Sequence, residues 1–370
     1  MLTNFKVRNF RNFDDWYTFN LKTSKNYEFN STAISNDNVL HSIIYGKNGC
    51  GKSNLGLALL DLSCHLNDNN ILASLRSNYL NANSEPDDIA EFEYEFEFDN
   101  DKVTYKYGKS DCSTTIYESL IINSEICIHL DRRNNTSAKY NLLGAESLKS
   151  DFSSSNISAV KYLGSNALLD KNNTNSAFNK FLDFVDGMVF FRTLNRHADF
   201  HGQNIDVKRL SEIIISENKL EDFEDFLNQA GIKCKLIIEG PKDNKVIHFD
   251  LGKKSLEFSQ VASTGTLSLG IFYYWWLKLE VKSLTFAFID EFDAYYHFEL
   301  SKLIVKKLSG INAQTILTTH NLSIMTNDLL RPDCYFLLAD KQYPFYELVD
   351  KDLRKAHNLE KIFKGLENEE

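Results

Sequence analysis

Residues Gly46–Ser53, with the sequence Gly-Lys-Asn-Gly-Cys-Gly-Lys-Ser, constrain the fold and chemistry of this chain more than any other segment. They fit the pattern Gly-x-x-x-x-Gly-Lys-Ser/Thr, in which the glycines let backbone N–H groups turn inward around a phosphate. An apolar segment, Val39–Tyr45, precedes the loop, and Asn54–Leu66, with leucines and alanines at helical spacing, follows it. Strand, glycine loop and helix in this order are the context that phosphate binding requires. The sequence therefore predicts a phosphate loop for ATP.

The residues of this loop have separate expected roles. Lys52 can reach the β and γ oxygens of the nucleotide, and the Ser53 hydroxyl can ligate Mg²⁺. The residues that we expect to bind the nucleotide here are Gly46, Asn48, Gly49, Gly51, Lys52, Ser53 and Asn54. ATP and Mg²⁺ are therefore the expected cofactors.

A second apolar segment, Phe286–Ile289, ends in two adjacent carboxylates, Asp290 and Glu291. Asp290 can hold the Mg²⁺ shell through water, so Ser53 and Asp290 are the predicted metal ligands. Glu291, one residue further along, can polarise the attacking water of a hydrolysis reaction. An apolar strand that ends in Asp-Glu is a weak signal by itself. It becomes strong here because it follows a phosphate loop at a distance that leaves room for an intervening domain.

A histidine follows a third apolar segment. His320 comes shortly after Gln314–Leu317, and its imidazole can donate a hydrogen bond to the γ-phosphate from a neighbouring strand end. A lone histidine in such a place is otherwise a capping or core residue. In combination with the two motifs above, we predict Glu291 and His320 as the catalytic residues of an ATPase.

A segment of small residues, Ser263–Thr266, precedes a helix that we expect to begin near Leu267. Such a helix end presents unpaired N–H groups and a positive dipole to an anion, although it is also an ordinary helix cap. Its position ahead of the Asp-Glu strand favours nucleotide binding by Ser263, Gly265 and Thr266. A second protomer could supply this helix end to the exposed γ-phosphate.

The order of phosphate loop, Ser-x-Gly segment, Asp-Glu strand and histidine resembles the ABC-type ATPases of the SMC, RecF and OLD group. The opening segment Phe5–Phe13 resembles the first strand of that head domain. Two further segments, Ala262–Leu267 and Asp290–His297, resemble the shorter AAA_15/AAA_21-type prokaryotic ATPases. So does Thr319–Asn321, followed by Leu330–Asp333.

This resemblance covers roughly residues 1–110 and 235–350 and implies an α/β fold. The expected architecture is a P-loop ABC-ATPase head with a mixed sheet, an antiparallel β subdomain and a helical insertion. The resemblance also implies a homodimer or higher homo-oligomer formed on ATP, in which each phosphate loop faces the partner's Ser263–Thr266. Many relatives act in phage defence or abortive infection with a nuclease or toxin, which implies a separate effector. The chain departs from the OLD type because roughly 50 residues follow His320, too few for a Toprim nuclease domain.

We expect three parts along the chain. Residues 1–125 would form the N-terminal lobe of the head, and residues 235–370 the C-terminal lobe with the Asp-Glu strand and His320. Residues 126–234 would be an inserted, largely helical region. Within it, residues 131–176 are rich in Asn and Ser and are expected to be partly mobile, whereas residues 178–232 have helical apolar spacing.

A β-hairpin is expected at residues 91–107. Glutamates alternate with aromatic residues over Glu91–Phe98, so the period of two predicts one acidic and one aromatic face. Lysines in the returning strand can oppose the glutamates. The acidic stripe is best explained as a solvated sheet face.

Composition limits the location and the partners. No apolar run approaches the roughly 20 residues that span a bilayer, and the N-terminus lacks the apolar stretch of a signal peptide. We therefore expect a cytoplasmic protein with no membrane contact. The six cysteines are scattered and are expected to be free thiols. The net charge of −10 argues against a protein that coats nucleic acid along its whole surface, although a local basic patch for DNA remains open.

Two functions compete at this stage. In the first, the ATPase senses a trigger and regulates a separate nuclease or toxin in anti-phage defence. In the second, it is a RecF- or SMC-like DNA-repair clamp. A third alternative, an ATP-binding scaffold without significant turnover, requires that Glu291 be dispensable. The acidic charge and the absence of sustained heptads favour the first function.

Overall fold

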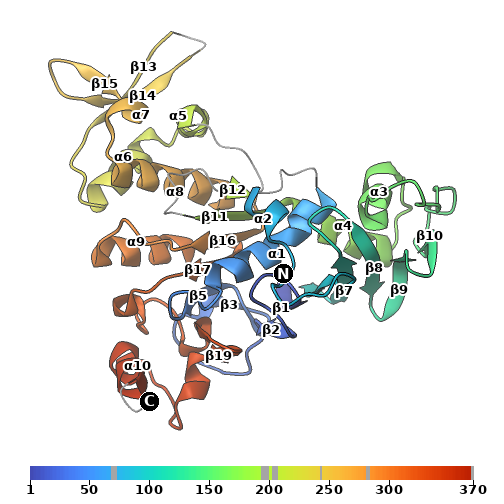
Figure 1. Ribbon diagram of the computed structural model, residues 1–370. Helices are drawn as coiled ribbons and strands as arrows, with labels where there is room; N and C mark the ends of the chain where they lie inside the picture. Colours follow the sequence, from blue (N-terminus) through green and yellow to red (C-terminus); the bar gives the residue numbers. More distant parts are fainter. Residues whose placement is uncertain (68–72, 193–199, 202–206, 242–243, 281–283, 368–370) are drawn as a thin grey trace.

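The centre of the computed structural model is a seven-stranded sheet with strand order β12-β11-β16-β17-β5-β18-β19 (Figure 1). The structure describes the chain except for residues 68–72, 193–199, 202–206, 242–243, 281–283 and 368–370. The strands of this central sheet are Phe200–His201 (β12), Met188–Arg192 (β11), Phe286–Asp290 (β16), Gln314–Thr318 (β17), His41–Tyr45 (β5), Tyr335–Leu338 (β18) and Gln342–Pro344 (β19). The five inner strands run parallel and the two edge strands antiparallel. The sheet is mixed, as predicted.

Helices cover both faces of this sheet. β5, β16 and β17 are buried at every position, as expected for parallel strands with apolar side chains on both faces. Phe190 stacks with Phe288 on the face that meets helix α1 (Lys52–Leu66). The next residue, Phe191, points to the other face and stacks on Trp275 of helix α8 (Thr264–Glu280). The three strands expected from the apolar segments are confirmed.

A second, antiparallel sheet has the strand order β10-β9-β8-β7-β6-β1-β2. Its strands are Asn135–Tyr140 (β10), Glu125–Asp131 (β9), Thr115–Ile122 (β8), Asp101–Lys109 (β7), Ala90–Phe98 (β6), Leu2–Arg8 (β1) and Tyr17–Asn20 (β2). The predicted hairpin is confirmed as β6 and β7. Its aromatic face is buried, and on the acidic face Glu93 pairs with Lys6 at 3.0 Å and with Lys106 at 2.8 Å. Neighbouring strands therefore neutralise much of the acidic stripe.

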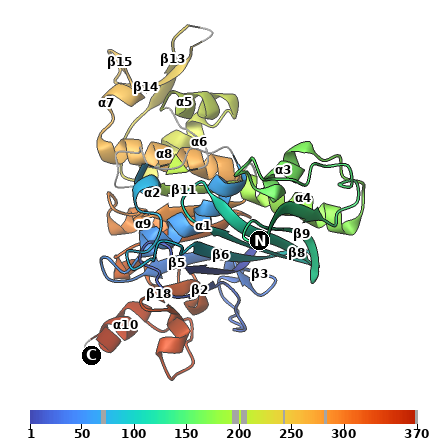
Figure 2. The ribbon, with the colours of Figure 1, turned by 45° about the vertical axis from the view of Figure 1, so that its right-hand side comes forward.

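Helix α1 lies between the two sheets (Figures 1 and 2). It is apolar around most of its circumference and is buried accordingly. At Gly56, a Cβ atom would lie 2.5 Å from the Phe288 ring and 2.7 Å from the Phe190 ring, so only glycine allows this close approach to the central sheet. On the opposite side, the Tyr94 hydroxyl donates to the Ala58 carbonyl at 2.7 Å. The helix that follows the phosphate loop is thus held by both sheets.

A lobe projects from the central sheet at the top of Figure 1. It contains α5 (Val207–Ser216), α6 (Leu220–Gln229), a small sheet of β13 (Leu236–Glu239), β14 (Val246–Asp250) and β15 (Ser255–Glu257), and α7 (Phe258–Val261). α7 leads into α8, which ties the lobe to the head. The Tyr273 hydroxyl of α8 donates to Asp222 of α6 at 2.7 Å, and Phe226 packs on the same ring.

Shorter elements complete the fold. They are β3 (Ile34–Ser35), β4 (Asn38–Val39), α2 (Ala73–Ser77), α3 (Ala159–Asn166), α4 (Asn173–Asp186), α9 (Phe298–Leu308), α10 (Leu359–Glu367) and the 3₁₀ turns Ser31–Ala33, Leu322–Ile324, Pro332–Cys334 and Phe345–Leu348. The α/β architecture with a mixed sheet and an antiparallel subdomain agrees with the expectation.

One expectation about the middle of the chain stays a prediction and another is wrong. Residues 131–176, expected to be an inserted and partly mobile region, contain β10 and α3, and polar side chains cap the helices here. That this region is inserted and partly mobile stays a prediction. The Ser158 hydroxyl accepts from the Lys161 N–H at 3.1 Å, and Asn172 caps α4 in the same way. Residues 178–232 are not helical throughout, because Met188–Arg192 forms strand β11. A short apolar run cannot be assigned to helix or strand by its periodicity.

The division of the chain at residues 125 and 234 stays a prediction. Residues 126–234 contribute most of β9 and all of β10 to the antiparallel sheet and β11 to the central sheet, in addition to helices. Among the residues that the structure describes, no helix is both long and apolar enough to cross a membrane.

Candidate functional site

The predicted phosphate loop, the two carboxylates and the histidine segment meet at one edge of the central sheet. β11, β16, β17 and β5 are parallel neighbours, so their carboxyl ends lie side by side. Arg192 at the end of β11 is in register with Asp290 at the end of β16. Thr318, which ends β17, is in register with Ile44, two residues before Gly46. The sheet thus brings the phosphate loop, the two carboxylates and the histidine segment to one place.

The phosphate loop has the conformation that its glycines predict. Gly49 and Gly51 have φ angles of 79° and 102°, in the left-handed region that other residues rarely adopt. Lys52 begins α1, and its Nζ donates to the carbonyls of Gly46 at 2.8 Å and Lys47 at 3.2 Å. Burial lowers the pKa of this amine. A phosphate at the loop would offer the amine a charged acceptor in place of these carbonyls.

Ser53 and Asp290, the two predicted metal ligands, are in direct contact. The Ser53 hydroxyl donates to Asp290 Oδ2 at 2.6 Å, and the Thr318 hydroxyl donates to Asp290 Oδ1 at 2.7 Å. The Asp290 carboxylate is completely buried. A buried charge is stable only when it is paired and hydrogen-bonded, and the two hydroxyls supply the hydrogen bonds.

The oxygens at this point fit Mg²⁺. Mg²⁺ prefers oxygen ligands and is commonly held by one or two carboxylates together with substrate phosphates. Within the described parts of the chain, no group of three or more His, Cys, Asp or Glu side chains could hold a metal ion alone. Ser53 and Asp290 would therefore hold the ion jointly with a nucleotide, and the bound ion would neutralise phosphate charge.

Glu291 leaves the sheet in an unusual conformation. Its φ angle is 49°, and its backbone N–H donates to the Thr318 hydroxyl at 2.8 Å. The same hydroxyl donates to Asp290, so Thr318 fixes both carboxylate residues. Burial and, secondly, the neighbouring Asp290 charge raise the pKa of Glu291, while the charges of Arg192 and Lys52 act in the opposite direction. A carboxylate with a raised pKa is better suited to accept a proton.

Glu291 and His320, the two predicted catalytic residues, line one cleft with a volume of about 320 Å³. Its other walls include Asp293 and Thr319, and the Thr319 hydroxyl donates to Asp293 at 2.7 Å. Burial and then the charge of Lys52 lower the pKa of His320, so the imidazole is neutral at pH 7. A neutral imidazole retains one N–H and can donate it to a phosphate oxygen.

Ser263, Gly265 and Thr266 lie at the start of α8, and no hydrogen bond among the described residues joins them to the phosphate loop. Ser263 is exposed, and its hydroxyl accepts from the Thr266 N–H at 3.2 Å at the start of α8. A Cβ atom on Gly265 would meet nothing within 4 Å, so packing inside the chain does not require glycine there. This helix end faces outward.

The structure adds residues that the sequence did not single out. Arg192 donates from Nε to Asp290 Oδ2 at 2.8 Å. Asn54, whose expected contact with the nucleotide stays a prediction, binds the segment after β1: it donates to Asn12 at 2.6 Å and accepts from Arg11 at 3.2 Å. Burial and the nearby Arg192 charge lower the pKa of Arg11. Two arginines with Lys52 thus concentrate positive charge beside the loop. From the sequence, these arginines could have been assigned to the site only because each lies at or after the end of a strand. Arginines at such positions are too common for this signal to be specific.

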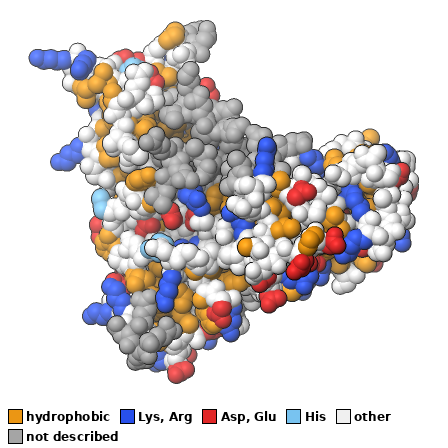
Figure 3. Space-filling model, viewed as in Figure 1, with side chains coloured by type: hydrophobic (Ala, Val, Ile, Leu, Met, Phe, Trp, Pro, Cys, Tyr) orange, Lys and Arg blue, Asp and Glu red, His pale blue; other side chains and the backbone are white. Residues whose placement is uncertain are grey.

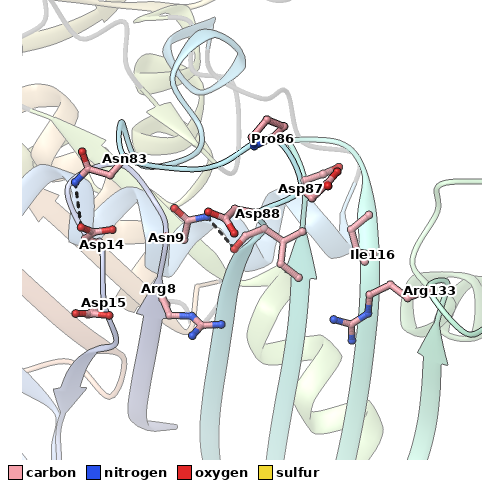
Figure 4. A pocket seen from close by; sticks show the side chains of 12 residues that line it. Arg8, Asn9, Asp14, Asp15, Asn83, Pro86, Asp87, Asp88, Ile116 and Arg133 are labelled. Carbon is pink, nitrogen blue, oxygen red and sulfur yellow. Dashed lines mark hydrogen bonds between the residues drawn. The ribbon is translucent and has the colours of Figure 1, made fainter.

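A larger cavity, of about 620 Å³, lies elsewhere, at the edge of the antiparallel sheet (Figure 4). Its walls include Arg8 and Arg133, and Asn83 donates to Asp14 at 3.0 Å on one side. None of the predicted nucleotide-binding residues lines it. Arg8 pairs with Glu91 and Arg133 with Asp131, so both guanidinium groups are already neutralised. The larger cavity is therefore separate from the residues that the sequence motifs predict.

The chain was compared with known proteins and with protein-family models. No curated protein matches the sequence. Among solved structures, an SMC head domain from Thermotoga maritima is 13% identical, with 92% of this chain and 97% of that chain covered and a TM-score of 0.45. An SMC head bound to the C-terminal winged-helix domain of ScpA is 17% identical, with 92% and 95% covered and a TM-score of 0.46. An SMC head with an extended coiled coil, bound to the C-terminal domain of ScpA from Pyrococcus furiosus, is 14% identical, with 99% and 98% covered and a TM-score of 0.48.

A family model matches residues 42–326, which include the phosphate loop, the Asp-Glu strand and the histidine. Its description is "AAA domain, putative AbiEii toxin, Type IV TA system". Since the match spans well over half of the sequence, the chain belongs to the AAA_21 family of P-loop ATPases.

Proposed function

We propose that this chain binds ATP with Mg²⁺, hydrolyses it, pairs with a second copy of itself while ATP is bound, and thereby regulates a separate nuclease or toxin in anti-phage defence. The observation that supports the ATPase most directly is the contact of Ser53 with Asp290 at 2.6 Å. Glu291, the residue after Asp290, shares a cleft with His320. The proposed Mg²⁺ site, called the metal seat and formed by Ser53 and Asp290, is therefore adjacent to the proposed general base Glu291.

Each residue has a defined role in this proposal. Lys52 and the loop N–H groups hold the β and γ phosphates, and Ser53 and Asp290 hold the ion that neutralises them. Glu291 orients a water molecule and takes its proton while the water attacks the γ-phosphorus and the bond to the β-phosphate oxygen breaks. The neutral His320 donates a hydrogen bond to the γ-phosphate.

Pairing explains the outward-facing helix end. The first N–H groups of α8 are positive, and Gly265 adds no side chain that would keep a phosphate at a distance. In a two-fold pair, Ser263–Thr266 of each copy would cover the phosphate loop of the other, because the same two patches meet twice. ATP would then act as the link between the copies.

The family description names a putative toxin and a Type IV TA system, which supports a role in a system with a toxic activity. That this activity belongs to a separate partner is part of our proposal. The six cysteines have free thiols, in agreement with the reducing cytoplasm as the place of action. The test is a pull-down of the chain expressed with its neighbouring reading frames, with and without ATP, followed by mass spectrometry. The matched control is Lys52→Ala, which should not respond to ATP.

A stoichiometric nuclease- or toxin-like partner whose retention changes with ATP for the wild type, and not for Lys52→Ala, is the expected result. If the chain is recovered alone or only with DNA, the effector model is rejected. The ATPase proposal is judged separately, by phosphate release.

A second candidate, a DNA clamp, is favoured by lysines on the projecting lobe. Basic side chains extend from this lobe in Figure 3. Among the residues that the structure describes, the exposed lysines of the small sheet and its flanks are Lys233, Lys235, Lys245, Lys253 and Lys254. If this surface binds DNA, exchanging Lys253 and Lys254 for Glu should weaken binding and reduce its salt dependence, while Lys306→Glu on α9 should not. Absence of ATP-stimulated, salt-sensitive DNA binding rejects this candidate.

A further inference from the structure

Arg192 forms an ion pair with Asp290, one of the two proposed Mg²⁺ ligands. It ends β11, in parallel register with Asp290 at the end of β16. Its Nε lies 2.8 Å from Asp290 Oδ2, and 26% of the Arg192 side chain is exposed, against 0% for Asp290. The guanidinium therefore lies at the mouth of the site, while the carboxylate lies inside it.

Both oxygens of Asp290 are occupied in this arrangement. Oδ1 accepts from Thr318, and Oδ2 accepts from both Ser53 and Arg192. The hydroxyls are neutral, so Arg192 supplies the positive charge that a buried carboxylate needs. Mg²⁺ held between Ser53 and Asp290 would supply the same charge at the same oxygen.

We infer that Arg192 is the counter-ion of Asp290 in the proposed Mg²⁺ site. In the absence of Mg²⁺, Arg192 pairs with the Asp290 carboxylate, and when Mg²⁺ binds, the ion displaces Arg192 from it. The inference rests on the proposed Mg²⁺-dependent ATP binding. Once released, the guanidinium remains at the strand end, beside the phosphate loop, where it can pair with phosphate oxygens of the nucleotide. Arg192 is thus a positioning residue in the resting state and a phosphate ligand in the loaded state.

Two opposite effects follow for Arg192→Gln. Without the ion pair, Mg²⁺ no longer displaces a cation, so the Mg²⁺ concentration that half-saturates nucleotide binding should fall about three- to tenfold. At saturating Mg²⁺, the affinity for the nucleotide should weaken by a similar factor, about three- to tenfold, because a phosphate contact is lost. A purely structural role would not produce shifts of opposite sign.

The experiment measures binding of a fluorescent, non-hydrolysable ATP analogue across a Mg²⁺ titration. Arg192→Lys, which keeps the charge, should leave the Mg²⁺ half-saturation within about twofold of wild type. Arg192→Met, which removes the charge, serves as the test if Arg192→Gln does not fold. Arg133→Gln, a surface arginine paired with Asp131, is the control for general loss of charge.

An unchanged or increased Mg²⁺ half-saturation in Arg192→Gln overturns the inference. If the wild-type chain binds the analogue without any dependence on Mg²⁺, the proposed function fails instead, so the two failures are distinguishable.

Discussion

Replacement of Glu291 by Gln tests the proposed chemistry most directly. The amide has the same shape as the carboxylate, and the backbone N–H can still donate to Thr318, so the fold should keep its stability within roughly 0.5 kcal/mol. What is lost is the ability to take a proton from water. General base catalysis contributes about 10²- to 10⁴-fold, or roughly 3 to 5 kcal/mol of the barrier. Turnover of ATP should fall by that factor, while ATP binding is retained.

Glu291→Gln should also remain a dimer. In the proposed cycle, hydrolysis reopens the dimer, so Glu291→Gln should accumulate an ATP-bound dimer. Phosphate release at saturating Mg²⁺–ATP measures turnover, and size-exclusion chromatography with light scattering measures the pair. Glu299→Gln, which removes an exposed carboxylate of α9 outside the cleft, is the matched control and should behave as wild type.

Turnover within about threefold of wild type would refute the assignment of Glu291 as base, since the expected loss is at least about a hundredfold. A monomer at saturating ATP would count against pairing. The scaffold alternative is supported only if the wild type itself releases no more phosphate than Lys52→Ala.

Further predictions concern binding, folding and pH. Lys52→Ala should abolish measurable ATP binding in a fluorescence titration, because the amine that neutralises the phosphates is gone; binding at wild-type affinity would contradict the loop assignment. Lys109 and Asp61 form a buried pair at 3.1 Å, so Lys109→Met should lower the free energy of unfolding by about 3 kcal/mol, whereas Lys106→Met on the surface should cost less than about 1 kcal/mol in the same urea titration. Burial lowers the pKa of His41 from 6.5 to about 4, so the unfolded chain takes up the proton first as pH falls. The contribution of His41 to the free energy of unfolding is therefore complete above pH 6.5 and is lost towards pH 4. His41→Gln should reduce the loss of stability between pH 6.5 and 4.5 by roughly 2 to 3 kcal/mol, and equal losses in both proteins would exclude His41 as the cause.

The local sequence was sufficient to predict those elements that have a residue pattern of their own. The phosphate loop could be predicted because its glycines, lysine and serine act through backbone geometry within eight residues. The hairpin at β6 and β7 could be predicted because strict alternation of aromatic and acidic residues fits only a strand with one buried face. The segment 188–192 had no such signal, and its assignment to strand depended on partners far away in the chain.

Sequence by itself determined which chemical groups this protein has: a phosphate loop, two adjacent carboxylates and a histidine, each after an apolar segment. Only the tertiary structure decided that Ser53 meets Asp290, that Arg192 pairs with the same carboxylate, and that Glu291 and His320 share a cleft. The physical reason is that local patterns fix backbone conformation over a few residues. The order and register of parallel strands depend on packing between segments more than 200 residues apart, as Ser53 and Asp290 are.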